Sequence, residues 1–312
     1  MENINETSTD FFLLGLFPPS RIGLFFFILI VLIFLMALFG NLSMIILIFL
    51  DTHLHTPMYF LLSQLSLVDL NFISNIVPKM ASDYLFENET ISFIGCGVQS
   101  FFFVALAGAE GLILASMAYD RYVAICFPLH YPTRMSKKVC VLLITGSWIM
   151  GSINSCAHTA YVLNIPYCRS RTINHFFCDL ATMLTLACMD TWVYEYTVFL
   201  SITLFLVFPF ICISCSYGRV LLAICRMQST EGRKKAYLTC STHIAVVSFY
   251  YAPFVYTYLR PRSFRSPTED KILAVFYTIL TPMLNPIIYS LRNKEVMGAL
   301  RRVIQRFCSV KI

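Results

Sequence analysis

Seven long stretches without charged residues constrain this chain more than any other feature. Each runs for 20 to 30 residues, and only two carboxylates, Asp69 and Glu110, interrupt them. A helix that spans a bilayer needs about 20 mostly apolar residues, and continuous apolar runs favour helices over the alternating strands of a barrel. The expected spans are Ile22–Leu50, Thr52–Pro78, Thr90–Tyr119, Val139–Cys168, Tyr196–Gly218, Ala236–Leu259 and Ile272–Leu291.

The composition excludes a water-soluble fold. Charged residues make up 13% of the 312 residues, against about 25% in soluble domains. A soluble enzyme, a disordered chain and a collagen-like fibre are therefore excluded. We predict an all-α membrane protein, a seven-transmembrane helix bundle with a short amphipathic C-terminal helix. The expected divisions are an extracellular segment over residues 1–22, the bundle over 23–292 and a cytoplasmic tail over 293–312.

The distribution of basic residues predicts the orientation. If the N-terminus lies outside, 15 of the 23 lysines and arginines fall on the cytoplasmic side, as the positive-inside rule requires. These charges act as topology signals and give no basis for nucleic-acid binding. The N-terminal residues lack a basic region, so we expect no cleaved signal peptide. The glycosylation sequons at Asn5 and Asn88 would then face outward.

Topology also divides the twelve cysteines. Eight lie in spans or face the reducing cytosol, where structural disulfides are rare; among these, Cys308 is either a free thiol or a palmitoylation site. Four lie on the oxidising side and permit three pairings, which the residues alone do not distinguish. They are Cys96, Cys168, Cys178 and Cys188.

Polar groups inside the spans are candidates for function because charge in the hydrocarbon core is costly. Asp69 and Glu110 should face the bundle interior, where they either share a proton, hold a small cation such as Na⁺, or are neutral and hydrogen-bonded. We expect no other metal and no cofactor. Pro209, Pro253 and Pro286 each remove a helical hydrogen bond, so the last three spans can bend there.

Several motifs resemble those of rhodopsin-type G-protein-coupled receptors. The receptor-wide motifs are Gly40-Asn41, Asp69, Asp120-Arg121-Tyr122, Trp148, Tyr217 and Asn285-Pro286-Ile287-Ile288-Tyr289. Longer strings resemble the tetrapod (class II) odorant receptors in particular, and the resemblance covers residues 5 to 305. These strings are Leu54 to Phe60, Met117 to Cys126, Lys235 to His243 and Pro282 to Asn293.

The resemblance implies specific pairings and roles. It implies disulfides Cys96–Cys178 and Cys168–Cys188, and a cytoplasmic cleft that opens for a G protein when the inner end of span six moves outward. The family's Phe-Tyr-Gly in span six is Phe249-Tyr250-Tyr251 here, so a tyrosine replaces its glycine. The residues implied in coupling are Asp120, Arg121, Tyr122, Tyr217, His243, Asn285, Pro286 and Tyr289.

Position along the spans predicts a ligand pocket in the outer half of the bundle. The set has no charge, so we expect a small, neutral, volatile organic agonist and disfavour an amine, because no acid is expected to face this half. The expected lining is Phe103, Val104, Ala107, Gly108, Ser201, Ile202, Phe205, Tyr250, Phe254, Thr257, Val275 and Thr278.

The resemblance therefore implies an odorant receptor of the plasma membrane that activates a stimulatory G protein and raises cyclic AMP. A trafficking accessory protein is a further candidate partner. A transporter or channel would show internal repeats or charged pathways, an opsin needs a lysine within span seven, and an intramembrane enzyme needs a motif that is absent. A non-nasal chemosensor on the same scaffold stays open as an alternative.

Overall fold

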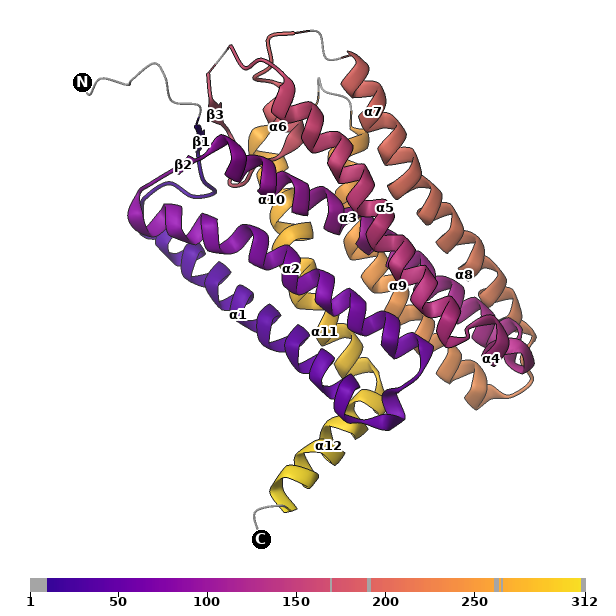
Figure 1. The fold of residues 1–312 in the computed structure, drawn as a ribbon. Coiled ribbons are helices and arrows are strands. Elements are labelled where there is room, and N and C mark those ends of the chain that lie inside the picture. The colour runs from indigo at the N-terminus through magenta and orange to yellow at the C-terminus, as the bar shows by residue number, and fades with distance from the viewer. Residues whose placement is uncertain (1–9, 169, 190–191, 261–263, 265, 310–312) are drawn as a thin grey trace.

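The structure is a computed structural model that describes residues 10–168, 170–189, 192–260, 264 and 266–309. Within these residues seven helical spans lie together in a bundle, and the expected fold class is confirmed (Figure 1). The first and last described residues, 10 and 309, lie at opposite ends of this bundle, called here the N-terminal and C-terminal ends (Figure 1). The spans are α1 (Arg21–Leu50), α2 (Pro57–Phe86), α3 (Phe93–Cys126), α5 (Lys137–Asn164), α7 with α8 (Trp192–Ile202 and Phe208–Arg226), α9 (Thr230–Leu259) and α10 with α11 (Pro267–Val275 and Thr281–Arg292).

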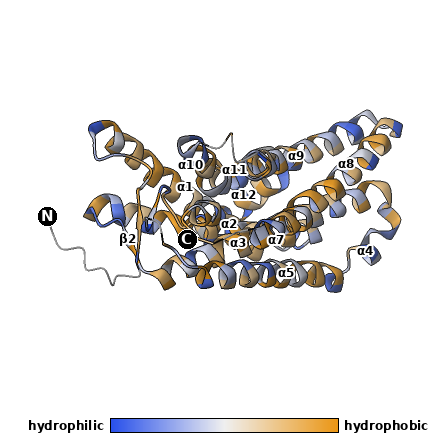
Figure 2. Ribbon diagram, turned by 90° about the horizontal axis from the view of Figure 1, so that it is seen from above, coloured by the Kyte–Doolittle hydropathy of each residue, from blue (hydrophilic) through white to orange (hydrophobic). Residues whose placement is uncertain are grey.

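Large apolar side chains cover the outside of the bundle. On α1, Phe39 is 76% exposed and Phe49 is 80% exposed. Figure 2 shows mostly hydrophobic residues along the long helices. Exposed apolar surface on this scale is unfavourable in water, but it is compatible with lipid tails. The outer surface of the bundle therefore fits a bilayer.

The second span begins later than the expected Thr52. The carboxylate of Asp51 accepts a hydrogen bond from the His53 N–H, and residues Thr52–Leu54 form a 3₁₀ turn. The helix α2 then starts at Pro57, because proline has no amide hydrogen and fits the first helical turn. Hydropathy alone did not distinguish this turn from the span.

The fifth and seventh spans each contain a π-helical turn, at Thr203–Val207 and Phe276–Leu280. Pro209 follows the first of these turns, while Pro253 lies inside α9. The carbonyl of Phe249, which Pro253 leaves without its helical donor, accepts a hydrogen bond from the Thr281 hydroxyl at 3.3 Å. The neighbouring helix therefore satisfies this carbonyl, as is usual for prolines in membrane helices.

Helix α3 lies in the middle of the bundle and packs against α2, α5, α8 and α9. Its contact with α5 is close at Gly151, where a Cβ atom would lie 2.5 Å from the Ala105 carbonyl oxygen and 3.1 Å from the Ala109 nitrogen. Small residues at such crossings allow two membrane helices to approach closely. At this crossing α3 and α5 are therefore in close backbone contact.

A small sheet at the N-terminal end was not expected from the sequence. Strand β1 (Phe11–Leu13) lies between β2 (Thr90–Ile91), which is antiparallel to it, and β3 (Thr172–Ile173), which is parallel. The chain following β1 is also fixed, because Lys271 donates a hydrogen bond to the Gly15 carbonyl at 2.8 Å. The N-terminal segment is therefore joined to two loops and to α10.

The expected C-terminal helix is present as α12 (Lys294–Ser309), beyond the last span. Arg302 on this helix pairs with Asp51 at 2.7 Å, and the Tyr59 hydroxyl donates to Glu295 at 2.9 Å. Burial alone would raise the pKa of Asp51, but hydrogen bonds from His53 and Arg302 outweigh it and lower the pKa to about 2. The start and middle of α12 are thus attached to the α1–α2 connection and to α2.

Candidate functional site

A cavity of about 440 Å³ lies in the N-terminal half of the bundle, between α3, α5, α6 (Leu180–Leu184), α7 and α9. Its volume is in the range of small-molecule sites. Nine of the twelve residues expected at the pocket line it: Phe103, Val104, Ala107, Gly108, Ser201, Ile202, Phe205, Tyr250 and Phe254.

The other three expected residues lie outside the lining of this cavity. Phe254, which lines the cavity, stacks on Tyr277 of the seventh span with ring centroids 4.4 Å apart. The Thr278 hydroxyl donates to the Ala274 carbonyl of its own helix at 2.6 Å. Val275 and Thr257 are likewise absent from the lining. The expectation that these three line the pocket is therefore not met by this cavity.

Aromatic residues form much of the cavity wall. Phe103 packs on Phe177 at 5.0 Å between ring centroids. The hydroxyl of Tyr250 donates to the Ala107 carbonyl at 2.6 Å, and that of Tyr251, which replaces the family's glycine, donates to the Gly111 carbonyl at 3.3 Å. Both hydroxyls are thus bound to backbone oxygens of α3, and the two rings are held against that helix.

The polar side of the cavity comes mainly from α5 and α7, and Ser201 was the one member expected. Asn154 and His158 also line the cavity, one helical turn apart on α5, together with Tyr194. Two polar residues at i and i+4 in an apolar span lie on one helix face, and this pattern is the signal that would have identified them.

Glu195 also lines the cavity, and its side chain is exposed. The expectation that no acid faces this half of the bundle was therefore wrong. Glu195 lies near the start of α7, outside the stretch Tyr196–Gly218 that the sequence predicted as a span. Glu195 is exposed, whereas the neighbouring polar residues Tyr194 and His158 are buried.

The loop between α5 and α7 covers the N-terminal end of the cavity. Disulfides join Cys96 to Cys178 and Cys168 to Cys188, with Cα atoms 5.5 and 5.6 Å apart, and these are the pairs that the resemblance implied. The Cys178 carbonyl also accepts from the Ser100 hydroxyl at 2.8 Å. The loop is therefore held to α3 covalently and by hydrogen bonding.

His175 lies within this loop and is 2% exposed. Its ring stacks on Phe176 at 4.8 Å and meets Phe177 edge-on at 4.4 Å. The pKa of His175 is lowered to about 4, chiefly by burial and to a smaller extent by nearby Lys271, while Asp179 opposes the shift. At neutral pH this imidazole is uncharged and packs as an aromatic ring.

Asp69 and Glu110 both lie in the bundle interior, at 0% and 1% exposure. Asp69 accepts a hydrogen bond from the Asn285 amide at 2.9 Å. One Glu110 oxygen, Oε1, has no hydrogen-bond partner among the described residues. Within this part of the chain no group of three or more His, Cys, Asp or Glu residues is arranged to hold a metal ion.

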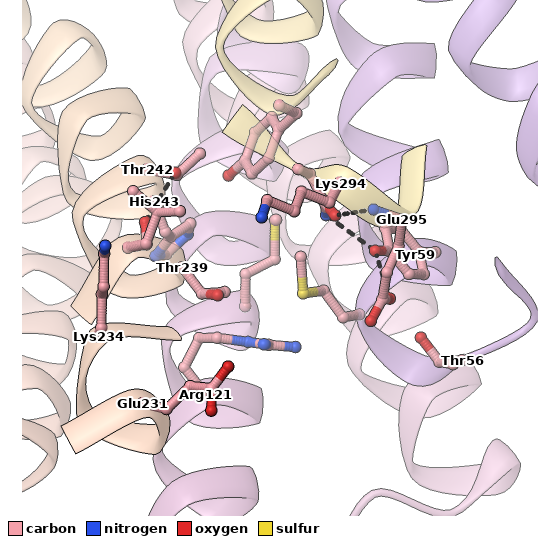
Figure 3. Close-up of a pocket in the computed structure, with 15 residues that line it drawn as sticks. Thr56, Tyr59, Arg121, Glu231, Lys234, Thr239, Thr242, His243, Lys294 and Glu295 are labelled. Atoms are coloured by element: carbon pink, nitrogen blue, oxygen red, sulfur yellow. Dashed lines mark hydrogen bonds between the residues drawn. The ribbon is translucent and has the colours of Figure 1, made fainter. Parts of the chain in front are cut away.

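A second cavity, of about 550 Å³, opens at the C-terminal end of the bundle. Figure 3 shows side chains from several helices around it, including Arg121 on α3, His243 on α9 and Glu295 on α12. Lys234 and Lys294 also line it, together with Glu231 and Glu295, so side chains of both charges lie around the cavity. Three of the residues that the resemblance implies in coupling line this cavity: Arg121, His243 and Tyr289.

Hydrogen bonds fix the coupling residues in pairs. Arg121 binds the carboxylate of Asp120 at 2.7 Å, and the Tyr131 hydroxyl donates to the same carboxylate at 2.7 Å. Tyr217 on α8 and His243 on α9 are joined at 2.5 Å. Arg121 is therefore paired with a residue of its own helix, α3, whereas His243 connects α9 to Tyr217 on α8.

The remaining implied residues are distributed around these pairs. The buried Tyr289 hydroxyl has no partner in the part of the chain that the structure describes. Pro286 approaches Gly40, where a Cβ atom would lie 2.9 Å from the Pro286 Cγ. Tyr122 packs edge-on against Phe127, with ring centroids 5.6 Å apart.

Comparison with known proteins decides the family. A family model described as olfactory receptor matches residues 30–307. The human proteins olfactory receptor 2L8 and olfactory receptor 2L3 are each 82% identical over 312 residues, which is the whole of both chains in each case. The chain belongs to the olfactory receptor family. Mouse olfactory receptor 2V1 is more distant, at 51% identity over 97% of this chain and 96% of that protein.

Membership in the olfactory receptor family shows a multi-pass membrane receptor rather than an enzyme. The family implies that small odorants bind and that a G protein couples. Of the sequons of this olfactory receptor, Asn88 is exposed before β2 and accepts a hydrogen bond from the Thr90 hydroxyl, whereas Asn5 lies outside the described residues. Cys308 is an exposed free thiol on α12.

Proposed function

We propose that this olfactory receptor lies in the plasma membrane with its N-terminus outside, and that a small, neutral, volatile organic molecule binds in the 440 Å³ cavity. Binding activates a stimulatory, olfactory-type G protein at the opposite end and raises cyclic AMP. The division into an outer segment over residues 1–22, a receptor domain over 23–292 and a cytoplasmic tail over 293–312 belongs to this proposal, as do glycans on Asn5 and Asn88.

The cavity itself carries the proposal. Its buried wall combines aromatic and aliphatic side chains with a few uncharged polar groups, and Glu195 is exposed. Burying apolar ligand surface contributes about 25 cal/mol per Å², whereas burying a charged ligand requires a buried countercharge. A neutral, mostly apolar ligand is therefore favoured.

The orientation rests on charge. Of the lysines and arginines, 15 of 23 lie in the loops and tail on the C-terminal side, which the positive-inside rule assigns to the cytoplasm. The 550 Å³ cavity with Arg121 would then face the cytoplasm, where a G protein is available. The disulfides would face the oxidising side.

A cyclic-AMP screen against a library of neutral volatile compounds tests the proposal in cells with verified surface expression. An agonist response should be lost in Arg121→Ala, and it should be weakened in Ile202→Trp, which fills part of the cavity. Gly146→Ala is the control, because a Cβ at Gly146 meets nothing within 4 Å. The proposal is contradicted if the surface-expressed receptor fails to raise cyclic AMP in response to any volatile compound. It is also contradicted if the Arg121→Ala variant responds to an agonist as the native receptor does.

A further inference from the structure

Four polar side chains form a continuous hydrogen-bonded chain along one wall of the 440 Å³ cavity. The Tyr194 hydroxyl lies 3.1 Å from His158 Nδ1, and His158 Nε2 lies 2.7 Å from Ser201 Oγ. Ser201 in turn donates to Asn154 Oδ1 at 2.7 Å. Tyr194 and His158 are 0% and 3% exposed, so water cannot readily replace these bonds.

The direction of donation in this chain follows from counting protons. A serine hydroxyl has one hydrogen and two lone pairs, and a neutral imidazole has one N–H. Because the hydrogen of Ser201 is given to Asn154, His158 must donate from Nε2. Its Nδ1 is then an acceptor, which takes the hydrogen of Tyr194. Every bond in the chain therefore runs from Tyr194 toward Asn154.

This direction leaves Ser201 as an acceptor for a ligand. Its hydrogen is used by Asn154 and one lone pair by His158, so one lone pair of Oγ is unfilled. Nδ2 of Asn154 makes no hydrogen bond within the described part of the chain and can donate to the same ligand atom. The serine and the amide together offer one acceptor and one donor side by side, which matches a hydroxyl group.

Other hydroxyls of the cavity wall do not supply a donor for a carbonyl ligand. Tyr250 donates to the Ala107 carbonyl, and Tyr258 donates to Asp179 at 3.4 Å. We infer that this receptor selects alcohols and phenols over aldehydes, ketones and ethers of the same skeleton, with Ser201 and Asn154 as the specificity-determining residues. His158 and Tyr194 are positioning residues that fix the proton direction. This inference rests on the proposed function of the same cavity.

Matched sets of compounds test the inference through concentrations for half-maximal cyclic-AMP response. Hexanol, octanol, decanol and benzyl alcohol are compared with their aldehydes and methyl ethers. An alcohol makes one more neutral hydrogen bond than either analogue, so its potency should be about tenfold higher. Ser201→Ala should reduce this ratio to about one.

Asn154→Leu gives the sharper test. Without Oδ1, the hydrogen of Ser201 is released, because Tyr194 still holds His158 as a donor toward Oγ. The serine can then donate to the oxygen of an alcohol, an aldehyde or an ether alike, so the alcohol preference should fall toward one. Adding Tyr194→Phe allows His158 Nε2 to accept that hydrogen, which leaves Ser201 as an acceptor again, so the alcohol preference should return. A purely structural role of Asn154 would lower all potencies together and leave their ratio unchanged.

The outcomes separate this inference from the proposed function. Native receptor that responds equally or better to aldehydes or ethers overturns the selectivity, and so does an unchanged ratio in Asn154→Leu; both leave the odorant function intact. If Ser201→Ala does not reach the surface, the ratio in Asn154→Leu decides. Surface-expressed receptor that responds to no volatile compound in the wider library overturns the proposed function and, with it, this inference.

Discussion

The side-chain amide of Asn41 on α1 donates a hydrogen bond of 2.8 Å to the carbonyl oxygen of Pro282 on α11. This carbonyl is the one that Pro286, four residues later, leaves without its helical N–H donor. Asn41 is 0% exposed and also donates to the Ala37 carbonyl at 3.0 Å. The first span therefore satisfies the backbone at the bend of the seventh.

Asn41→Ala should destabilise the bundle by about 1 kcal/mol, because one interhelical hydrogen bond is lost and a carbonyl is left unpaired in the core. Thermal unfolding of the purified receptor in detergent or nanodiscs measures the effect. Asn71→Ala is the matched control, since Asn71 makes the same kind of bond to its own helix, to Leu67, but on an exposed face. Equal melting temperatures for the two variants would contradict the role of Asn41.

Gly151→Ala should separate α3 from α5 and reduce surface expression. The new Cβ would lie 2.5 Å from the Ala105 carbonyl oxygen, a backbone atom that cannot rotate away. Gly146→Ala on the same helix has open space and should behave as the native receptor. Quantitative surface labelling compares the two, and native-like expression of Gly151→Ala would show that the helices can adjust at this crossing.

Cys178→Ser should lose surface expression or agonist response, because it releases the loop over the cavity from α3. Loss of a disulfide typically costs about 2–5 kcal/mol. Cys156→Ser, at an exposed free cysteine, controls for cysteine replacement. Surface labelling and cyclic-AMP assays are the measurements, and a native response in Cys178→Ser would remove this attachment from the mechanism.

The loop over the cavity should become less stable in mild acid because of His175. Its pKa is about 4 in the folded loop, below the ordinary value of 6.5. Between these values the unfolded chain binds a proton that the folded chain does not, so stability falls as the pH decreases from 6.5 toward 4. His175→Phe should flatten this dependence in melting temperatures measured from pH 7.5 to 5. An identical slope in both proteins would assign the effect to other groups.

The attachment of α12 should respond to pH in a different range. Asp51 has a folded pKa of about 2, below its ordinary value of 3.8. Its contribution to stability is therefore complete above pH 3.8 and is lost as the pH falls through about 2.

Arg302→Ala should increase hydrogen exchange of residues 294–309 at pH 7, whereas Arg306→Ala, at an exposed position, should not. Equal exchange in both variants would argue against the pair as the anchor of α12.

Hydropathy predicted the seven spans because each is a long, almost uncharged run of apolar residues. Position along the spans anticipated nine of the residues that line the 440 Å³ cavity, since positions at a regular helical period fall on one face. Val275 and Thr278 do not line this cavity, and Thr278 lies in the π-helical turn Phe276–Leu280, where an added residue shifts the faces of the helix. A regular period of 3.6 residues cannot represent such an insertion.

Other details of the structure were not predicted from the sequence. Strands of two or three residues, such as Thr90–Ile91, are too short to show an alternating pattern. The hydrogen bonds of His158 and Asn154 depend on which helix lies opposite, and this is a property of the assembled bundle. Glu195 lay outside the expected span because charge was used to mark its boundary.

The order of strands in the small N-terminal sheet has a consequence for synthesis of the receptor. Residues 11–13 form the middle strand, between partners at 90–91 and 172–173. The ribosome makes both partners later, so the central strand must wait until more than half of the chain has been translated before its two edges are paired. The sheet is therefore completed late, and a nascent receptor arrested before residue 173 would present an unfinished strand edge to the quality-control machinery.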